Sequence, residues 1–247
     1  MAQNIYDNAD FFAGYSQFAR SREGLAGAPE WPSLKAMLPD LTGARVLDLG
    51  CGFGHFSRWA TEAGASKVTG VDLSERMLEQ AESLTTDSRI SYQRGDLSLL
   101  EFPQESFDLV YSSLAFHYLP DCLTVFKAIR ERLIPGGHFV FSVEHPLFTA
   151  PLNPHWQTEE DGTVSWALNN YLVEGKRVTN WVSSGVVKYH RSLETYLKCL
   201  LENGFSLNHL IEWRPNASQL QEHPEWTSEL HRPMFLLLGA VASSEGS

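Results

Sequence analysis

The sequence predicts an α/β fold in which a doubly wound, mostly parallel sheet of seven strands carries helices on both faces. From residue 44 onward, short apolar runs alternate with segments of helical length and helical apolar spacing. The apolar runs are nearly continuous, as is typical of strands that are buried on both faces. A strand, a helix and a second strand in succession form a right-handed crossover that makes the two strands parallel.

The first strand is expected at residues 44–50 and ends at glycine. A helix follows at 53–63, and Ser74 is expected to cap a second helix because serine commonly accepts the free N–H groups of a first turn. A third helix is expected at 121–133, ended by the Pro-Gly-Gly at 135–137. The remaining elements are strands at 67–73, 89–97, 107–113 and 138–145, a helix at 192–205, and closing strands at 206–213 and 234–242.

Residues 146–190 interrupt this alternation and are rich in proline, asparagine, tryptophan and tyrosine. A hairpin turn is expected around Glu174-Gly175. We expect the insertion to cap the carboxyl ends of the strands, where an open α/β sheet binds its ligand. The predicted parts are an N-terminal helical lid segment (1–41), the sheet domain (42–145 and 191–242), the inserted cap (146–190) and a disordered tail (243–247).

Composition argues against several classes of protein. The net charge is −11 and there is no basic run, which opposes binding to the nucleic-acid backbone. The three cysteines are widely spaced and form neither a disulfide framework nor a metal site. The first residues do not resemble a secretory signal, and no apolar run reaches the about 18 residues of a membrane span. We expect a cytoplasmic monomer or homodimer that binds no nucleic acid, membrane or metal.

The stretch VLDLGCGFGHF (46–56) places three glycines directly after the first strand. A P-loop would require GxxxxGK[ST], which is absent. A dinucleotide-binding GxGxxG would require a third glycine where His55 stands. The remaining possibility is a ligand without phosphates, to which glycine lets the backbone come close.

VLDLGCGFG, with Asp48 two places before its first glycine, resembles the signature loop of class I (Rossmann-like) S-adenosylmethionine-dependent methyltransferases of the bacterial small-molecule type. Asp72, Asp96 in GDL, FDLVYSSLAFHYL and LIPGGHFVFS match later motifs of the family, in order, over residues 42–143. The resemblance implies S-adenosylmethionine (SAM) as cofactor and a small-molecule methyl acceptor. It also implies the strand order 3-2-1-4-5-7-6, with the last strand antiparallel.

The resemblance also implies roles for individual residues. Asp72 would accept both ribose hydroxyls, as an ionised carboxylate can, and Asp96 would accept the adenine amino group. Asp48 either contacts the cofactor or only ties the loop down through backbone N–H groups, and Cys51 is expected to be a small buried side chain rather than a nucleophile. The expected cofactor contacts are Tyr6, Tyr15, Asp48, Gly50, Cys51, Gly52, Asp72, Leu73, Met77, Asp96, Leu97 and Ser112.

Two regions outside the insertion could help to form the acceptor pocket. Tyr6 and Tyr15 belong to an aromatic N-terminal segment that either closes over the cofactor or packs on the core as an amphipathic helix. His117 follows the fourth strand, where the methyl group should point, and could act as a base, orient the acceptor or only bond a backbone carbonyl. His145, at the end of the fifth strand, has the same possible roles.

The insertion supplies many aromatic side chains, which favour a flat acceptor through stacking. A satellite core or a dimer surface is the alternative interpretation. The expected substrate contacts are Phe116, Trp156, Trp166, Tyr171, Trp181, Tyr189 and His190. We expect methyl transfer to a small, planar aromatic or heteroaromatic metabolite, with nitrogen favoured over oxygen because a neutral amine needs no base. A non-catalytic SAM-binding regulatory or dimerisation module and an NAD-type oxidoreductase are the alternatives.

Overall fold

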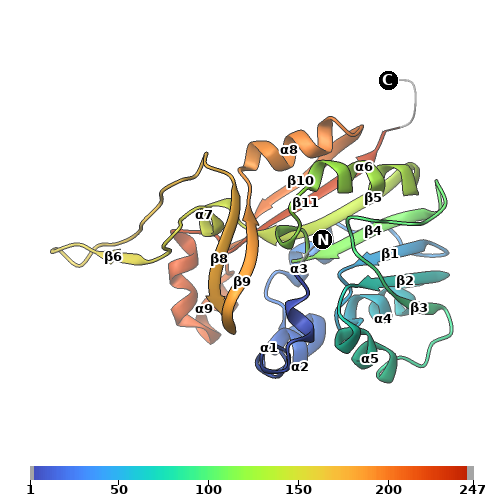
Figure 1. Ribbon diagram of the computed structural model, residues 1–247, viewed down its shortest axis with the longest axis horizontal. Helices are drawn as coiled ribbons and strands as arrows, with labels where there is room; N and C mark the ends of the chain where they lie inside the picture. Colours follow the sequence, from blue (N-terminus) through green and yellow to red (C-terminus); the bar gives the residue numbers. More distant parts are fainter. Residues whose placement is uncertain (1–2, 244–247) are drawn as a thin grey trace.

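A seven-stranded sheet forms the centre of the computed structural model, which describes residues 3–243 (Figure 1). Its order is β3-β2-β1-β4-β5-β11-β10, and β11 runs antiparallel to both of its neighbours. The predicted fold class, strand order and direction are therefore confirmed. The strands are β1 (Arg45–Leu49), β2 (Lys67–Asp72), β3 (Ile90–Arg94), β4 (Phe107–Ser113), β5 (Leu133–Glu144), β10 (Phe205–Glu212) and β11 (Phe235–Ala242).

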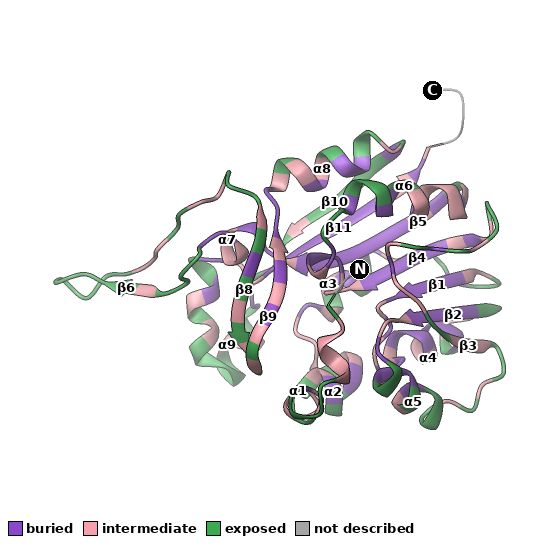
Figure 2. Ribbon diagram, in the orientation of Figure 1, coloured by how far each residue is buried: buried purple, intermediate pink, exposed green. Residues whose placement is uncertain are grey.

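Helices cover both faces of the sheet, and most of the strand residues between them are buried (Figure 2). Successive residues of β1 point to opposite faces. Val46 packs in one core with Phe56 of α4, whereas Leu47 packs in the other with Phe126 of α6. The helices that flank the sheet are α3 (Trp31–Ala36), α4 (His55–Glu62), α5 (Glu75–Ser83), α6 (Cys122–Arg132) and α8 (Leu193–Leu201).

Two sequence-based boundaries were wrong. The fifth strand begins at Leu133, which pairs with Phe107 of β4, and an irregular register there accommodates the Pro-Gly-Gly within the strand. The expected hairpin turn at Glu174-Gly175 is instead the open end of the hairpin, because Gly175 pairs with His190. The turn lies at Val182, a non-glycine residue with a φ of 62°, so it carries no glycine signal.

The insertion contains two hairpins and one short helix. The hairpin at residues 156–166 was not expected from the sequence, and it extends away from the sheet (Figure 1). The hairpin at residues 175–190 lies beside the carboxyl ends of the central strands (Figure 1). The elements are α7 (Pro146–Thr149), β6 (Trp156–Thr158), β7 (Val164–Trp166), β8 (Gly175–Trp181) and β9 (Ser183–His190).

The N-terminal segment bridges the sheet and the insertion. The carboxylate of Asp7 accepts a hydrogen bond from the Ser74 hydroxyl (2.6 Å) at the start of α5. The Gln3 side chain donates to the Gly185 carbonyl (3.1 Å) and accepts from the Val187 N–H (2.9 Å) on β9. Before α3 the segment forms η1 (Ile5–Asp7), α1 (Ala9–Tyr15), α2 (Ala19–Arg22) and η2 (Gly24–Gly27).

The C-terminal part adds α9 (Ala217–Glu222) and η4 (Pro224–Leu230) between the last two strands. Ser243, the first residue of the expected disordered tail, donates to the Gly204 carbonyl (2.9 Å), and residues 244–247 lie outside the described range. Every helix within residues 3–243 is too short or too polar to span a bilayer. The same range holds no group of three histidine, cysteine or acidic side chains arranged to bind a metal ion.

Candidate functional site

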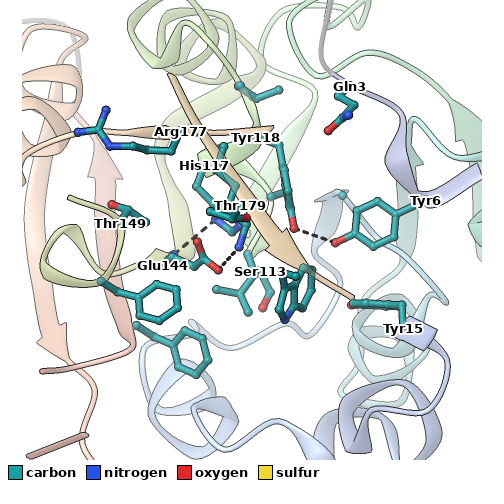
Figure 3. Close-up of a pocket in the computed structure, with 18 of the residues that line it drawn as sticks. Gln3, Tyr6, Tyr15, Ser113, His117, Tyr118, Glu144, Thr149, Arg177 and Thr179 are labelled. Carbon is teal, nitrogen blue, oxygen red and sulfur yellow. Dashed lines mark hydrogen bonds and ion pairs between the residues drawn. The ribbon is translucent and has the colours of Figure 1, made fainter. Parts of the chain in front are cut away.

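A cavity of about 1090 Å³ opens at the carboxyl edge of the sheet (Figure 3). Its floor comes from the segments that follow β1, β2, β3 and β4, and its walls come from the N-terminal segment and the β8–β9 hairpin. Ligand pockets commonly measure roughly 300–1,000 Å³. This cavity is therefore large enough for a nucleoside-sized ligand and a second small molecule.

The glycine-rich loop after β1 forms part of the floor. Gly50 and Gly52 both have positive φ values, 74° and 51°. A Cβ at Gly50 would lie 2.6 Å from the Cβ of Ala115, so this position requires glycine for packing against the segment after β4. A Cβ at Gly52 would meet nothing within 4 Å. The space beside Gly52 is thus open to a ligand.

Asp72, at the end of β2, holds this loop in place and also lines the cavity. One carboxylate oxygen accepts from the Gly52 N–H and the other from the Ser74 N–H, each at 2.9 Å. Burial raises the pKa of the carboxyl group. A carboxylate has about four acceptor sites, so Asp72 retains capacity for two hydroxyl donors. Asp96 and Leu97 line the cavity beyond it, and Asp96 accepts from the Ser98 N–H (2.9 Å).

Asp48 lies below the loop and is 2% exposed. Its carboxylate accepts a hydrogen bond from the Ser57 hydroxyl (2.6 Å), which connects β1 to α4. Burial raises the pKa of Asp48 to about 7. Together with Cys51, whose thiol pKa burial also raises, Asp48 lines a separate recess of about 100 Å³. Asp48 therefore braces the loop from beneath rather than facing the main cavity.

The part of the cavity near β5 and β9 contains a buried ion pair. Lys188 Nζ lies 2.5 Å from Glu144 Oε1, and the side chains are 4% and 13% exposed. The Lys188 ammonium also lies 4.7 Å from the ring centroid of Trp181. Burial opposes ionisation of Glu144, but nearby positive charges, including that of Lys188, outweigh it and lower the pKa of Glu144. Glu144 is therefore ionised at neutral pH.

His117 lies beside this ion pair (Figure 3). Burial lowers the pKa of the ring to about 4, so the imidazole is neutral at physiological pH. Its Nδ1 accepts a hydrogen bond from the backbone N–H of Glu144 (3.4 Å). A neutral imidazole whose Nδ1 accepts must carry its proton on Nε2. In this tautomer His117 offers a hydrogen-bond donor through Nε2 rather than a base.

Comparisons with known proteins agree with this geometry. Residues 47–141 match the family model described as a methyltransferase domain. The chain is 51% identical to a SAM-dependent methyltransferase from Mesorhizobium loti whose crystal structure is known, with a TM-score of 0.85 over 88% of this chain and 100% of that one. The chain belongs to the SAM-dependent methyltransferases.

Two further relatives differ in how much they share with this methyltransferase. A solved structure of a putative SAM-dependent methyltransferase from Listeria monocytogenes is 41% identical, with a TM-score of 0.80 over 88% of this chain and 99% of that one. A malonyl-[acyl-carrier protein] O-methyltransferase from Erwinia billingiae is 39% identical over 115 residues, which is 47% of this chain and 45% of that protein. The second relative therefore shares only part of its length with this chain.

SAM is the cofactor of this methyltransferase, and the residues at the cavity floor fit it. The open side of Gly52 and the acceptors of Asp72 and Asp96 match a ligand with an amino-acid end and an adenosine end. The buried Asn4 Oδ1, which has no hydrogen-bond partner among the described residues, adds a further acceptor at the wall. The expected cofactor contacts that line the main cavity are Tyr6, Tyr15, Gly50, Gly52, Asp72, Leu73, Asp96 and Leu97.

Met77 and Ser112, two other expected cofactor contacts of the methyltransferase, lie outside both cavities. Met77 is 2% exposed on the inner side of α5. The Ser112 hydroxyl donates to the Leu49 carbonyl (2.8 Å) between β4 and β1. Each side chain is used in packing because it points into the sheet–helix interface.

Of the expected substrate contacts, Trp181 lines the cavity. The others lie outside the cavity wall. Phe116 is fully buried and packs edge-to-face with Phe126 of α6. Trp156 and Trp166 surround the guanidinium of Arg232, whose carbon lies 5.3 and 4.6 Å from their ring centroids. They serve a small satellite core at the base of the β6–β7 hairpin.

The remaining expected residues serve the insertion itself. His190 bonds the Tyr171 carbonyl (2.8 Å) and Thr149. Tyr189 follows Lys188 on β9 and therefore points to the opposite face of the hairpin. His145 Nδ1 accepts from the Leu147 N–H (3.1 Å), and its Nε2 lies 3.0 Å from Glu212, so the ring caps α7 outside the cavity.

Sequence reasoning missed several residues of the wall, above all Glu144, Lys188, Arg20 and Phe18. One signal could have identified Glu144, because it is the charged residue at the carboxyl end of a buried strand, next to His145. Arg20 pairs with the fully buried Glu30 (3.0 Å) and lines both cavities. Lys188 had no comparable signal, since its partner lies 44 positions away.

Proposed function

We propose that this methyltransferase transfers a methyl group to a small, planar aromatic or heteroaromatic metabolite. The observation that carries the proposal is an aromatic wall on the acceptor side of the cavity. The rings of Phe18 and Trp181 lie 5.7 Å apart with an interplanar angle of 4°. Tyr15 meets Trp181 edge-on at 6.1 Å, and the ring centroid of Tyr118 lies 5.9 Å from the Lys188 ammonium. Such surfaces favour flat ligands through stacking.

A small acceptor is favoured because the wall is closed by contacts between distant parts of the chain. The Tyr6 and Tyr118 hydroxyls lie 3.2 Å apart and join the N-terminal segment to the loop after β4. Gln3 joins the same segment to β9. A protein or nucleic-acid substrate would need an open groove at this position, and these contacts occupy it.

SAM supplies an activated methyl group on a sulfonium, so the protein's task is to align the acceptor and exclude water. Among the described side chains at the acceptor end, neither His117 nor the tyrosine phenols are suited to act as a base. His117 presents its Nε2 proton, and burial raises the pKa of the phenols of Tyr6 and Tyr118. Glu144 can stabilise positive charge that develops on a nitrogen. We therefore favour nitrogen over oxygen as the methylated atom.

The relative from Erwinia billingiae is by its name an O-methyltransferase, so the test must distinguish the two atoms. A panel of cyclic and acyclic metabolites is incubated with the enzyme and SAM, S-adenosylhomocysteine (SAH) release is measured, and products are identified by mass spectrometry and NMR. We expect turnover with planar rings and methylation at nitrogen. Turnover restricted to acyclic acids would refute the proposal, and a ring methylated at oxygen would refute the choice of atom.

The aromatic wall is tested by Trp181→Ala, with Trp59→Ala as the matched control. Trp59 is a partly buried tryptophan on α4 that packs on Trp31 and does not line the cavity. Removing a stacking ring costs about 1.4 kcal/mol, which corresponds to an increase of about tenfold in the KM of the ring acceptor. The control should leave this KM unchanged. Equal KM values for both variants would refute the stacking role.

A further inference from the structure

The buried pair of Glu144 and Lys188 has bonding capacity that the protein does not use. Glu144 Oε1 receives the lysine ammonium, but Oε2 is buried and has no hydrogen-bond partner among the described residues. The hydroxyl oxygen of Thr179 is also buried without a partner in the same range. Both residues line the cavity (Figure 3). A buried polar atom without a partner is costly, so these atoms are suited to bond a ligand.

The hairpin register explains why these groups meet. On β9, Val186, Lys188 and His190 alternate on the buried face. Thr179 of β8 pairs with Val186, so its side chain lies on that same face. The end of β5 then brings Glu144 against Lys188. The insertion thus places the Lys188 ammonium against the Glu144 carboxylate of the sheet domain.

If the pair of Glu144 and Lys188 served only to connect β5 to β9, we would expect the protein to satisfy its remaining donors and acceptors. Burying two charges costs several kcal/mol per ion, and such a pair is favourable only when the remaining acceptors and donors are satisfied. Among the described residues, one carboxylate oxygen has no donor, and the three donors of the ammonium meet one carboxylate oxygen and the ring of Trp181 (4.7 Å). The missing bonds point to a ligand that supplies one donor and one acceptor.

We propose that the methyl acceptor presents a hydrogen-bond donor beside a hydrogen-bond acceptor, as in the lactam or amidine edge of a neutral heteroaromatic ring. Glu144 Oε2 accepts from the donor of this edge, and Lys188 Nζ donates to its acceptor. The pair has no net charge, which matches a neutral ligand. An anionic ligand would compete with Glu144 for the ammonium and weaken the pairing of the buried carboxylate. This inference rests on the proposed function and narrows its substrate class.

The test uses three bicyclic rings of similar size and the intact enzyme saturated with SAH. The probes are 2-quinolone, which has an N–H beside a carbonyl, its N-methyl derivative, which lacks the donor, and quinoline, which has only an acceptor. Binding is measured by isothermal titration calorimetry. Sites built to bond an N–H reject analogues without it, so we expect 2-quinolone to bind at least about tenfold more tightly than either analogue.

Variants then assign the discrimination to the pair. Glu144→Leu/Lys188→Met removes both charges and both polar groups together, so that neither charge is left buried alone and no acceptor remains at position 144. Its matched control is Lys198→Met/Glu202→Leu, which removes an exposed pair at the C-terminal end of α8 (3.7 Å). The first double variant should bind all three rings with similar affinity and keep its affinity for SAH, whereas the control should discriminate like the wild type.

Each outcome is informative. Equal affinity of the wild-type enzyme for the three rings refutes this inference and leaves the planar-ring proposal standing. Binding of none of the rings by an enzyme that holds SAH refutes both. A preference that persists in the double variant refutes the assignment to Glu144 and Lys188. The comparison of rings on the wild-type protein needs no variant, so a variant that does not fold leaves the inference testable.

Discussion

Asp72→Asn is the substitution that tests the cofactor site most directly. In the structure, the two carboxylate oxygens of Asp72 each accept a backbone N–H, from Gly52 and Ser74, at 2.9 Å. Asparagine has the same shape but only one oxygen, and its amide nitrogen donates. The variant must therefore give up one of the backbone bonds. It also loses the charge that would strengthen hydrogen bonds from the ribose hydroxyls, the role that we propose for Asp72.

The magnitude follows from the bonds that are lost. A hydrogen bond to a charged group contributes about 1.5–3 kcal/mol. If Asp72 binds the ribose as we propose, the loss of one such bond and the weakening of the other remove about 3 kcal/mol, and the Kd of SAH increases about 100-fold. The broken bond to the glycine loop adds to this loss. The loop is then less ordered in the free protein and loses more conformational entropy when the ligand binds.

The assay is isothermal titration of SAH into the purified variant. Asp121→Asn is the control, since Asp121 accepts the Thr124 N–H (3.1 Å) as the cap of α6 and does not line the cavity. Asparagine caps helices about as well as aspartate, so the control should bind SAH with the wild-type affinity. An Asp72→Asn variant whose Kd stays within threefold of the wild type would falsify the assignment of Asp72 to the ribose.

Two other predictions concern the glycine loop. The pKa of Asp48 is about 7 in the folded state and about 4 in an unfolded chain, so the folded state binds this proton more tightly and the free energy of unfolding falls as pH rises from about 4 to about 7, by about 4 kcal/mol. Urea unfolding of the cofactor-free protein at pH 5 and pH 8 should show that Asp48→Asn, which keeps an acceptor for Ser57, removes this fall; an undiminished fall would contradict it. Gly52→Ala should cost about 1–2 kcal/mol of backbone strain, whereas Gly54→Ala, whose Cβ would lie 2.0 Å from the Tyr92 hydroxyl at a φ of 70°, should cost about 1–3 kcal/mol more. Equal losses in the two alanine variants, measured by the same urea unfolding, would show that Tyr92 moves aside freely.

The fold and the cofactor end of the site could be predicted from the sequence because they depend on local contacts. The strand, turn and helix around Gly50 form from adjacent residues, and their apolar spacing and glycines record that structure directly. Asp72 and Asp96 follow neighbouring strands of a parallel sheet, so their carboxylates reach the same edge. The family resemblance implied that these two strands are neighbours, and the structure confirms that they pair.

The acceptor end was decided by tertiary structure. The tryptophans of the insertion go to two different places. The pairing of β8 with β9 places Trp181 at the cavity, whereas the β6–β7 hairpin places Trp156 and Trp166 around Arg232. Glu144 meets Lys188 because the insertion folds back over β5. Such contacts join residues far apart in the chain, and strand register alone determines which side chains face inward. The sequence by itself indicated the methyl donor's site, and the packing of the insertion determined the wall that we propose for the acceptor.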